Sequence, residues 1–314
     1  MSSVFRLAKS TDELNDILHL RYLCLLASGA KVASQLVYTE RYLDPLDILP
    51  NTLHIGGYSD GLCTASIRAA GYSAKDKLQN QWVRLDEINP TLTDSCYILD
   101  HLCLNELCKN RTGSLRQLLQ MTMLLLSSHS VQKAFFLAPK NVVVQLVEMG
   151  FSQISEGVSV NQNELIPLLM DVAAFHERLI QNVIDKEIMR FQGVFYGTLF
   201  EAGEVIVVEG ERGANAHILL DGSVDVIIKT PNGLKSIRSI EKGNLIGEVA
   251  MITADARTAS LVAKTDCICL SFDRSNFMKL LYSEPHRSVD VFKILSKRLS
   301  ESNKKLAAMG SSKT

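Results

Sequence analysis

The sequence lacks the features that place a protein in a membrane or around a structural metal. No stretch reaches ~18 consecutive apolar residues, the length expected of a membrane-spanning helix, and residues 1–10 hold no apolar signal core. The seven cysteines occur singly, without the paired CxxC spacing of a metal site. A formal net charge of −1 leaves no broad basic field for non-specific binding to nucleic acid or anionic lipid. The sequence therefore predicts a cytoplasmic protein with reduced thiols, no metal, no membrane span and no DNA partner.

The sequence does contain enough apolar residues for two cores. The chain has 314 residues, of which 46% are hydrophobic and 21% charged, a globular composition in a length that exceeds one usual core. Residues 1–172 alternate helical and strand patterns, residues 173–192 are helical, and glycines divide residues 193–314 into short strands before a last helix. We therefore predict an α+β protein with domains at 1–172 and 193–314, joined by a helical connector at 173–192.

Local patterns predict the elements of the amino-terminal part. Apolar spacing and capping residues indicate the helices, and the turn residues Ser59-Asp60-Gly61 indicate a hairpin. The predicted elements are a helix from Thr11, a hairpin of His54–Tyr58 and Cys63–Ala69, a strand at Tyr97–Leu104, a helix at Ser114–Ser128, a strand at Ala134–Ala138 and a helix at Val142–Met149.

The segment from Gly247 to Ala259, which reads GEVAMITADARTA, has the residues of an anion site. A short helix beginning near Glu248 would direct backbone N–H groups at an anion, and Arg257 would add a guanidinium suited to phosphate oxygens. A carboxylate beside a phosphate would repel it, so Glu248 makes sense as an acceptor for a sugar hydroxyl.

This segment resembles the phosphate-binding cassette of the cyclic nucleotide-binding domain found in kinase A regulatory subunits, catabolite activator proteins and gated channels. The family pattern is G-E-x-A, an Arg ten residues after the Gly, a small residue and Ala. The segments Phe200–Glu204 and Ile218–Val224 resemble the family's early strands, so the resemblance covers about residues 175–300. It implies a β-barrel (jelly roll) with flanking helices that binds cAMP or cGMP through Gly247, Glu248, Val249, Ala250, Arg257, Thr258 and Ala259.

The resemblance also implies individual roles. Arg257 would hold the cyclic phosphate and Glu248 the ribose 2′-hydroxyl, while Gly247 and Ala259 would contribute backbone N–H groups. A hydroxyl at Thr258 is associated with guanine, but bacterial cAMP-binding members carry it too, so the base stays open. The alternative is that Glu248 and Arg257 form an ion pair in a domain without ligand. No helix-turn-helix follows the last predicted helix, so we expect the output in the amino-terminal half or in a partner.

The first 172 residues resemble the GNAT acyltransferase fold, in the branch of the acyl-homoserine lactone and N-acyl amino acid synthases. The order of elements carries the resemblance, with the short motifs His19-Leu20-Arg21-Tyr22, Asp44-Pro45-Leu46-Asp47, Ile67-Arg68 and Met149-Gly150-Phe151. It implies a mixed sheet with flanking helices and an acyl donor carried on CoA or on an acyl carrier protein. The matching substrate residues are Arg21, Asp44, Asp47 and Arg68.

The catalytic and donor positions depart from that family's pattern. Asp100 matches the acid of the fourth strand, but Cys103 stands where an Arg is expected. The donor loop retains Gly113 before Ser114 and gains Arg111, and these three are the candidate contacts for the carrier's phosphate.

Acyl transfer needs a base for the attacking amine, and the candidates are Asp100 and His101. Strand alternation predicts that one of this pair points inward. The non-catalytic alternatives are that Asp44 and Asp47 cap a turn, that Arg21 is a structural ion-pair partner, that His54 is a satisfied strand residue, and that Cys103 and Cys108 are inert.

Two functions follow as hypotheses. The first is a bacterial N-acyltransferase of GNAT fold whose activity is regulated by a cyclic nucleotide on the carboxy-terminal domain. The second is a catalytically inactive GNAT-like half that acts as a nucleotide-responsive signalling module. An apolar stripe on the last helix fits either packing on its own domain or a homodimer seam, and it comprises Phe292, Leu295, Leu299 and Leu306.

Overall fold

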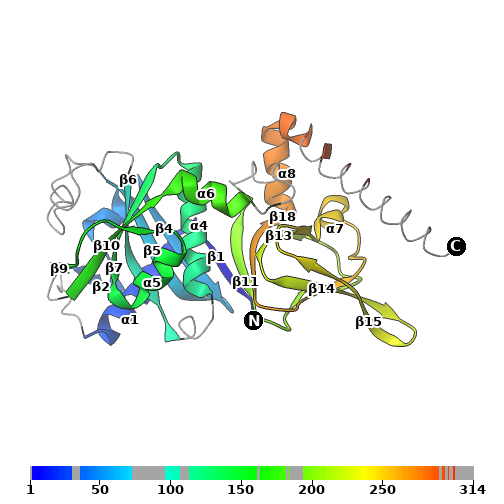
Figure 1. The fold of residues 1–314 in the computed structure, drawn as a ribbon, viewed down its shortest axis with the longest axis horizontal. Helices are drawn as coiled ribbons and strands as arrows, with labels where there is room; N and C mark the ends of the chain where they lie inside the picture. Colours follow the sequence, from blue (N-terminus) through cyan, green and yellow to red (C-terminus); the bar gives the residue numbers. More distant parts are fainter. Residues whose placement is uncertain are drawn as a thin grey trace.

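The computed structural model describes residues 2–29, 36–72, 96–106, 113–160, 163–181, 183, 194–289, 292–293, 296 and 300. The amino-terminal half places strands and helices in alternation (Figure 1). Its elements are β1 (Ser3–Leu7), α1 (Thr11–Ala27), β2 (Val37–Tyr38), β3 (Arg41–Tyr42), η2 (Pro45–Ile48), β4 (Thr52–Ser59), β5 (Leu62–Gly71), β6 (Cys96–Leu104), α4 (Ser114–Ser128), β7 (Lys133–Pro139), α5 (Lys140–Glu148), β8 (Ser152–Gln153), β9 (Val158–Val160), β10 (Asn163–Asp171) and α6 (Val172–Ile180).

The carboxy-terminal half consists of short strands and short helices. Its elements are β11 (Tyr196–Phe200), β12 (Val205–Val207), β13 (Asn215–Asp221), β14 (Ser223–Thr230), β15 (Gly233–Glu241), β16 (Leu245–Ile246), α7 (Glu248–Thr253), β17 (Ser260–Ala263), β18 (Cys267–Asp273), α8 (Arg274–Ser283) and η5 (Pro285–Arg287). The sheet β12-β17-β14-β15 and the strands β16-β13-β18-β11 enclose an apolar interior that includes Phe200, Leu219, Val226 and Cys269. This arrangement is the predicted jelly-roll barrel.

Most predicted elements of the amino-terminal half lie where their patterns placed them. The helix predicted at 114–128 is α4, and the hairpin turn has left-handed backbone at Asp60 (φ 52°) and Gly61 (φ 78°), as a tight hairpin requires. The capping hydroxyl of α1 differs from the expectation, because Ser10 rather than Thr11 accepts the hydrogen bond from the N–H of Glu13. Helix α6 begins one residue before the predicted connector and covers its residues 173–180, whereas residues 182 and 184–192 lie outside the described residues. Leu295, Leu299 and Leu306 of the predicted stripe also lie outside them.

A single sheet runs through both halves of the described chain. Its order is β16-β13-β18-β11-β1-β4-β5-β6-β7-β10-β8, with β9 paired to β10. The joint is β1, because Val4 is the register partner of Tyr58 in β4 on one side and of Thr198 in β11 on the other. The first strand therefore bridges the amino-terminal half and the barrel.

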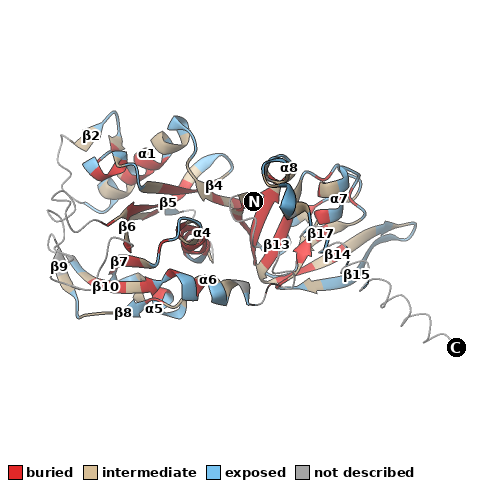
Figure 2. Ribbon diagram, turned by 90° about the horizontal axis from the view of Figure 1, so that it is seen from above, coloured by how far each residue is buried: buried red, intermediate tan, exposed pale blue. Residues whose placement is uncertain are grey.

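Helix α4 packs against the cores of both halves. Its Leu118 and Leu119 lie in the amino-terminal core, which also includes Leu199 and Ile268 from the barrel strands. Its Leu124 belongs to a second cluster with the outer face of β13 and β18. Figure 2 shows buried residues in the central strands, in α4 and in the barrel.

Among the described strands, β6 and β7 form the one parallel pair. They pair from Cys96 to Leu99, while β6 pairs with β5 on its other side from Tyr97 to Leu104. Parallel neighbours need a crossover connection, and α4 supplies it. The crossover leaves the carboxyl end of β6 and runs through α4 to the start of β7.

Among the described residues, no helix is long and apolar enough to cross a membrane.

Candidate functional site

The predicted anion segment is a tight turn followed by a short helix. Gly247 follows β16 with left-handed backbone (φ 75°), and α7 begins at Glu248. A Cβ at Gly247 would lie 2.8 Å from Nη1 of Arg257, so glycine is required there for backbone and for space. Ala254, also left-handed (φ 61°), ends the helix and returns the chain toward Arg257. The local sequence thus brings both ends of the segment together.

Arg257 is anchored in the barrel wall by backbone carbonyls. Its Nη2 donates to the carbonyl of Asn215 at 2.6 Å, and its Nη1 donates to the carbonyl of Gly247. Burial lowers the pKa of this guanidinium, and the nearby Glu248 and Glu211 work in the opposite direction. A guanidinium has five N–H donors, and these two bonds fix its plane while leaving capacity for an anion. Gly213 provides the space, because a Cβ there would lie 2.9 Å from Cζ of Arg257.

All seven residues predicted to hold the nucleotide line one groove of about 150 Å³. They are Gly247, Glu248, Val249, Ala250, Arg257, Thr258 and Ala259. The side chains of Glu248 and Arg257 are each 8% exposed overall, whereas Thr258 is exposed. The barrel strands also contribute to the groove, among them through Val226, Arg238 and Ile240. Charged and apolar side chains therefore line the same groove.

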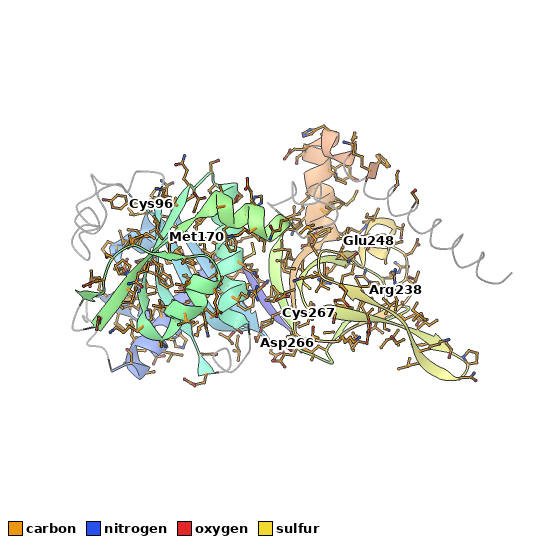
Figure 3. All side chains as sticks on the ribbon, viewed as in Figure 1. Cys96, Met170, Arg238, Glu248, Asp266 and Cys267 are labelled. Carbon is orange, nitrogen blue, oxygen red and sulfur yellow. The ribbon has the colours of Figure 1, made fainter. Side chains whose placement is uncertain are left out.

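Arg238 is a groove residue that the sequence did not reveal. It lies on β15, and Figure 3 shows it on the same side of the barrel as Glu248. Strand alternation in β14–β15 is interrupted by a register shift between Val226 and Ile227. Because a bulge changes which side chains face the barrel interior, the pattern of residues 233–241 could not identify Arg238.

The predicted substrate residues of the amino-terminal half form a buried ion cluster. Arg21, on α1, is fully buried and its Nη1 lies 2.6 Å from Oδ1 of Asp47. Arg68, on β5, is 1% exposed and reaches Asp44 at 2.6 Å, Asp47 at 2.9 Å and Asp100 at 2.6 Å. The cluster connects α1, η2, β5 and β6.

The structure also shows the structural roles that the sequence offered as alternatives for Asp44, Asp47, Arg21 and His54. Asp44 and Asp47 form a capping box at η2, so they do cap a turn. Arg21 is a buried ion-pair partner. His54 is a satisfied strand residue, since its Nδ1 lies 3.0 Å from Nη2 of Arg21 and its Nε2 lies 3.2 Å from the carbonyl of Asp47. Burial, followed by the charge of Arg21, lowers the pKa of His54.

The electrostatics of the cluster lower the pKa of Asp44 and of Asp47. Burial by itself raises the pKa of Asp44, but hydrogen bonds from His101 and Arg68 outweigh it and hold that pKa well below its usual range. Burial opposes the charge of Arg68, yet Asp100, Asp44 and Asp47 raise its pKa. The positive and negative side chains of the cluster therefore stabilise one another's charged forms.

A bulge brings both candidate bases to this cluster. His101 has left-handed backbone (φ 48°), and the β5–β6 register shifts between Ser66 and Arg68. Asp100 pairs with Arg68, while Nε2 of His101 lies 3.0 Å from Oδ2 of Asp44. Simple alternation, which would turn only one of the pair inward, is wrong here because the bulge interrupts it.

The predicted donor-phosphate residues lie at the junction with the barrel. Gly113 precedes α4 with left-handed backbone (φ 87°), and a Cβ there would meet Leu199 and Ile268 of the barrel. Ser114 is 1% exposed and its Oγ has no hydrogen-bond partner in the described structure. Arg111 lies outside the described residues.

Of the two cysteines predicted as inert, Cys103 lies among the described residues. Cys103 is buried and hydrogen-bonded to Cys24, and this bond with burial raises the pKa of the Cys103 thiol, as expected for an unreactive side chain. Cys108 lies outside the described residues. Among the described residues, no group of three or more His, Cys, Asp or Glu side chains is arranged to hold a metal ion.

Comparison with known proteins identifies the barrel. Residues 198–284 match the family described as the cyclic nucleotide-binding domain. The chain is 31% identical over 127 residues to cGMP-dependent protein kinase, isozyme 1, of Drosophila melanogaster, and 26% identical over 144 residues to the cAMP-dependent protein kinase regulatory subunit of Schizosaccharomyces pombe. These alignments cover 39% and 46% of this chain, but 15% and 33% of the relatives.

Two further comparisons concern the same region. The CRP-like cAMP-activated global transcriptional regulator of Mycobacterium tuberculosis is 27% identical over 109 residues, which are 34% of this chain and 49% of that protein. The crystal structure of a cyclic nucleotide-binding domain from Methylobacillus flagellatus is 24% identical, with a TM-score of 0.37, over 42% of this chain and 82% of that one. The family match identifies residues 198–284 as a cyclic nucleotide-binding domain. The chain spans less than half the length of these curated relatives.

Proposed function

We propose that the barrel binds a cyclic mononucleotide, cAMP or cGMP, in the groove between α7 and β15. The observation that carries the proposal is that Glu248 and Arg257 line one groove together with the rest of the cassette. The guanidinium of Arg257 holds the cyclic phosphate, with backbone N–H groups at Gly247 and Ala259. Glu248 accepts from the ribose 2′-hydroxyl, because a carboxylate repels phosphate and attracts a hydroxyl donor.

Arg238, which β15 contributes to the groove, favours guanine as the base. With the phosphate at Arg257, we place the base against Val226, Arg238 and Ile240 of the barrel sheet. An arginine fork matches the two acceptors of guanine, O6 and N7, whereas adenine presents an amino donor at the first of these positions. Thr258 adds a hydroxyl on the cassette side. The preferred ligand is therefore cGMP, and cAMP is the weaker one.

Calorimetry with cAMP and cGMP on the wild type and Arg257→Ala tests the binding site. Loss of a charge-assisted contact weakens binding by at least ~2 kcal/mol. Because Arg257 also bonds two backbone carbonyls, thermal unfolding of both proteins must be measured. Arg274→Ala, which does not line the groove, is the matched control. Equal affinities of wild type and Arg257→Ala would refute the assignment.

The second candidate function belongs to the amino-terminal half: an N-acyltransferase that takes its acyl group from CoA or from an acyl carrier protein. The strand order supports this function. It is β1-β4-β5-β6-β7-β10-β8, and β6 and β7 form the one parallel pair among the described strands. The hydrogen bond between His101 and Asp44 supports it too. In the neutral tautomer whose Nε2–H donates to Asp44, the Nδ1 of His101 accepts a proton from the amine. Asp100 is the poorer base, because both its oxygens bond Arg68.

Thioester consumption separates this function from a catalytically inactive signalling half. The wild type is assayed with acyl-CoA and acyl-carrier-protein donors and a mixture of amines, with and without cyclic nucleotide. Turnover that is about 10²-fold or more lower in His101→Gln than in the wild type supports the acyltransferase function. A loss of this size is typical of the removal of a general base. No consumption with any donor would establish the inactive module instead.

A further inference from the structure

A second cavity, of about 330 Å³, lies at the other side of Arg257. It opens where β1 pairs with β11, so Ser2 and Val4 of the amino-terminal strand form part of its wall. Figure 1 shows the amino terminus beside β11 at the lower edge of the barrel. It shares two lining residues, Val207 and Arg257, with the nucleotide groove, and Glu248, Thr258 and Arg238 line the groove alone. The two cavities therefore have different linings and are adjacent at Val207 and Arg257.

The wall of this cavity presents a buried hydrogen-bond donor. Thr198 donates from Oγ1 to Oγ of Ser271 at 2.8 Å, and that Oγ lies 2.7 Å from Nδ1 of His217. Ser271 is fully buried, and among its described partners the acceptor available for its own proton is Nδ1 of His217. His217 is 4% exposed and neutral, since burial, followed by the charge of Arg257, lowers its pKa to about 3. Its one proton consequently lies on Nε2, for which the structure gives no partner.

The charges around the cavity favour an acceptor-rich ligand. Two arginines, Arg212 and Arg257, line it, and Glu211 is the one acid among the lining residues. Tyr196 adds a phenol, whose pKa burial and Asp273 raise to about 12, so it is a neutral donor. The wall also includes apolar side chains, among them Val4 and Phe200. A cavity that combines cations, hydrogen-bond donors and apolar side chains suits an organic anion.

We propose that this cavity is a second ligand site, which takes a small organic anion whose charged group meets Arg257 and the Nε2–H of His217. The volume is within the range of small-molecule sites, roughly 300–1,000 Å³. Backbone contacts connect the site to the cassette, because the N–H of Arg257 donates to the carbonyl of Glu211 at 2.8 Å and the N–H of Gly210 donates to the carbonyl of Arg257 at 2.9 Å. The inference does not depend on which cyclic nucleotide the groove binds, or on activity of the other half.

Ligand-observed NMR on the full chain tests the site with benzoate, phenyl phosphate and benzamidine as probes. The first two carry a carboxylate and a phosphate on the same ring, and benzamidine is a cation of similar shape. We expect saturation transfer to at least one anion and none to benzamidine. The stronger anion identifies the charged group. Transfer to neither anion, or equal transfer to all three probes, would overturn the proposal.

Two variants locate the binding. Val4→Trp fills the cavity, and His217→Phe keeps a ring but removes the donor; each should weaken anion binding about tenfold or more. Glu248 lines the nucleotide groove and does not line the second cavity, so Glu248→Gln is the matched control and should retain anion binding. Retained cyclic nucleotide binding shows that Val4→Trp is folded. Anion binding that persists in Val4→Trp but is lost in Glu248→Gln would place the probe in the groove and refute a second site.

Discussion

At the scale of single residues, Arg238 decides the proposed choice of base. Removing its fork in Arg238→Ala should cost cGMP about 1–3 kcal/mol of binding free energy, the value of a good bidentate base contact. Binding of cAMP should change much less, so the ratio of the two dissociation constants moves toward unity or reverses. Isothermal calorimetry with both nucleotides measures this ratio.

Lys235→Ala is the control for this change of charge. Lys235 lies on the same strand and does not line the groove. If both variants weaken cAMP and cGMP by the same factor, Arg238 acts through the general electrostatic field. In that case the assignment of guanine to the β15 end of the groove is wrong.

His217 gives the barrel a specific dependence on pH. Its pKa of about 3 in the folded barrel is below the 6.5 of an ordinary histidine. Between these values the unfolded chain binds a proton that the folded one does not, so stability present above pH 6.5 is lost as the pH falls. One such proton changes the free energy of unfolding by about 1.4 kcal/mol per pH unit.

His217→Gln removes this proton while retaining an acceptor for Ser271. From pH 6.5 to pH 4.5, the wild type should lose about 2 kcal/mol more unfolding free energy than the variant. Urea denaturation at several pH values measures the difference. Other histidines with lowered pKa values, such as His54, contribute equally to both proteins. Parallel pH profiles would show that His217 is not buried as a neutral ring.

At the scale of elements, the buried ion cluster holds four pieces of the amino-terminal half together. Arg68 contacts carboxylates of η2 and β6 from its place on β5. Arg68→Met removes the cation that all three acids share and leaves Asp47 with Arg21 and Asp44 with His101. Loss of one partner from a buried ion cluster should cost about 3–5 kcal/mol of unfolding free energy. Arg6→Met is the comparison, because Arg6 pairs with Glu13 while 41% exposed. An exposed pair contributes roughly 1 kcal/mol or less, so equal urea midpoints for the two variants would contradict this view of the cluster.

The elements show how far the sequence predicts the fold. Helix α4 has the bounds that its apolar spacing and Gly113 predict, because these signals are local. The cassette could also be predicted from the sequence, because its turn glycine, helix and arginine lie within eleven consecutive residues. The bulge at His101 was not predictable from alternation, because the left-handed backbone that breaks it depends on the neighbouring strand β5. The role of β1 was also hidden, because its partner β11 lies nearly two hundred residues away in the sequence.

At the scale of the whole molecule, strand β1 and helix α4 connect the proposed nucleotide site to the other half. Besides the β1–β11 pairing, Nε2 of Gln117 on α4 donates to the carbonyl of Cys269 at 3.0 Å, and Arg116 pairs with Asp221 at 3.1 Å. Gly113, at the start of α4, lies at this same junction, because a Cβ there would contact Leu199 and Ile268 of the barrel. A ligand that stabilises the barrel must therefore also stabilise its contact with α4.

This coupling predicts one cooperative unfolding transition. Cyclic nucleotide at about 100 times its dissociation constant should raise the unfolding free energy by ≈ 2.7 kcal/mol. Hydrogen exchange should slow in β1 and α4 as well as in the barrel, because residues of both halves share these contacts. Arg257→Ala with the same nucleotide is the control and should show neither effect. Two separate unfolding transitions, only one of them shifted by the nucleotide, would contradict this coupling. In that case the halves at 1–172 and 193–314 fold independently even though they share a sheet.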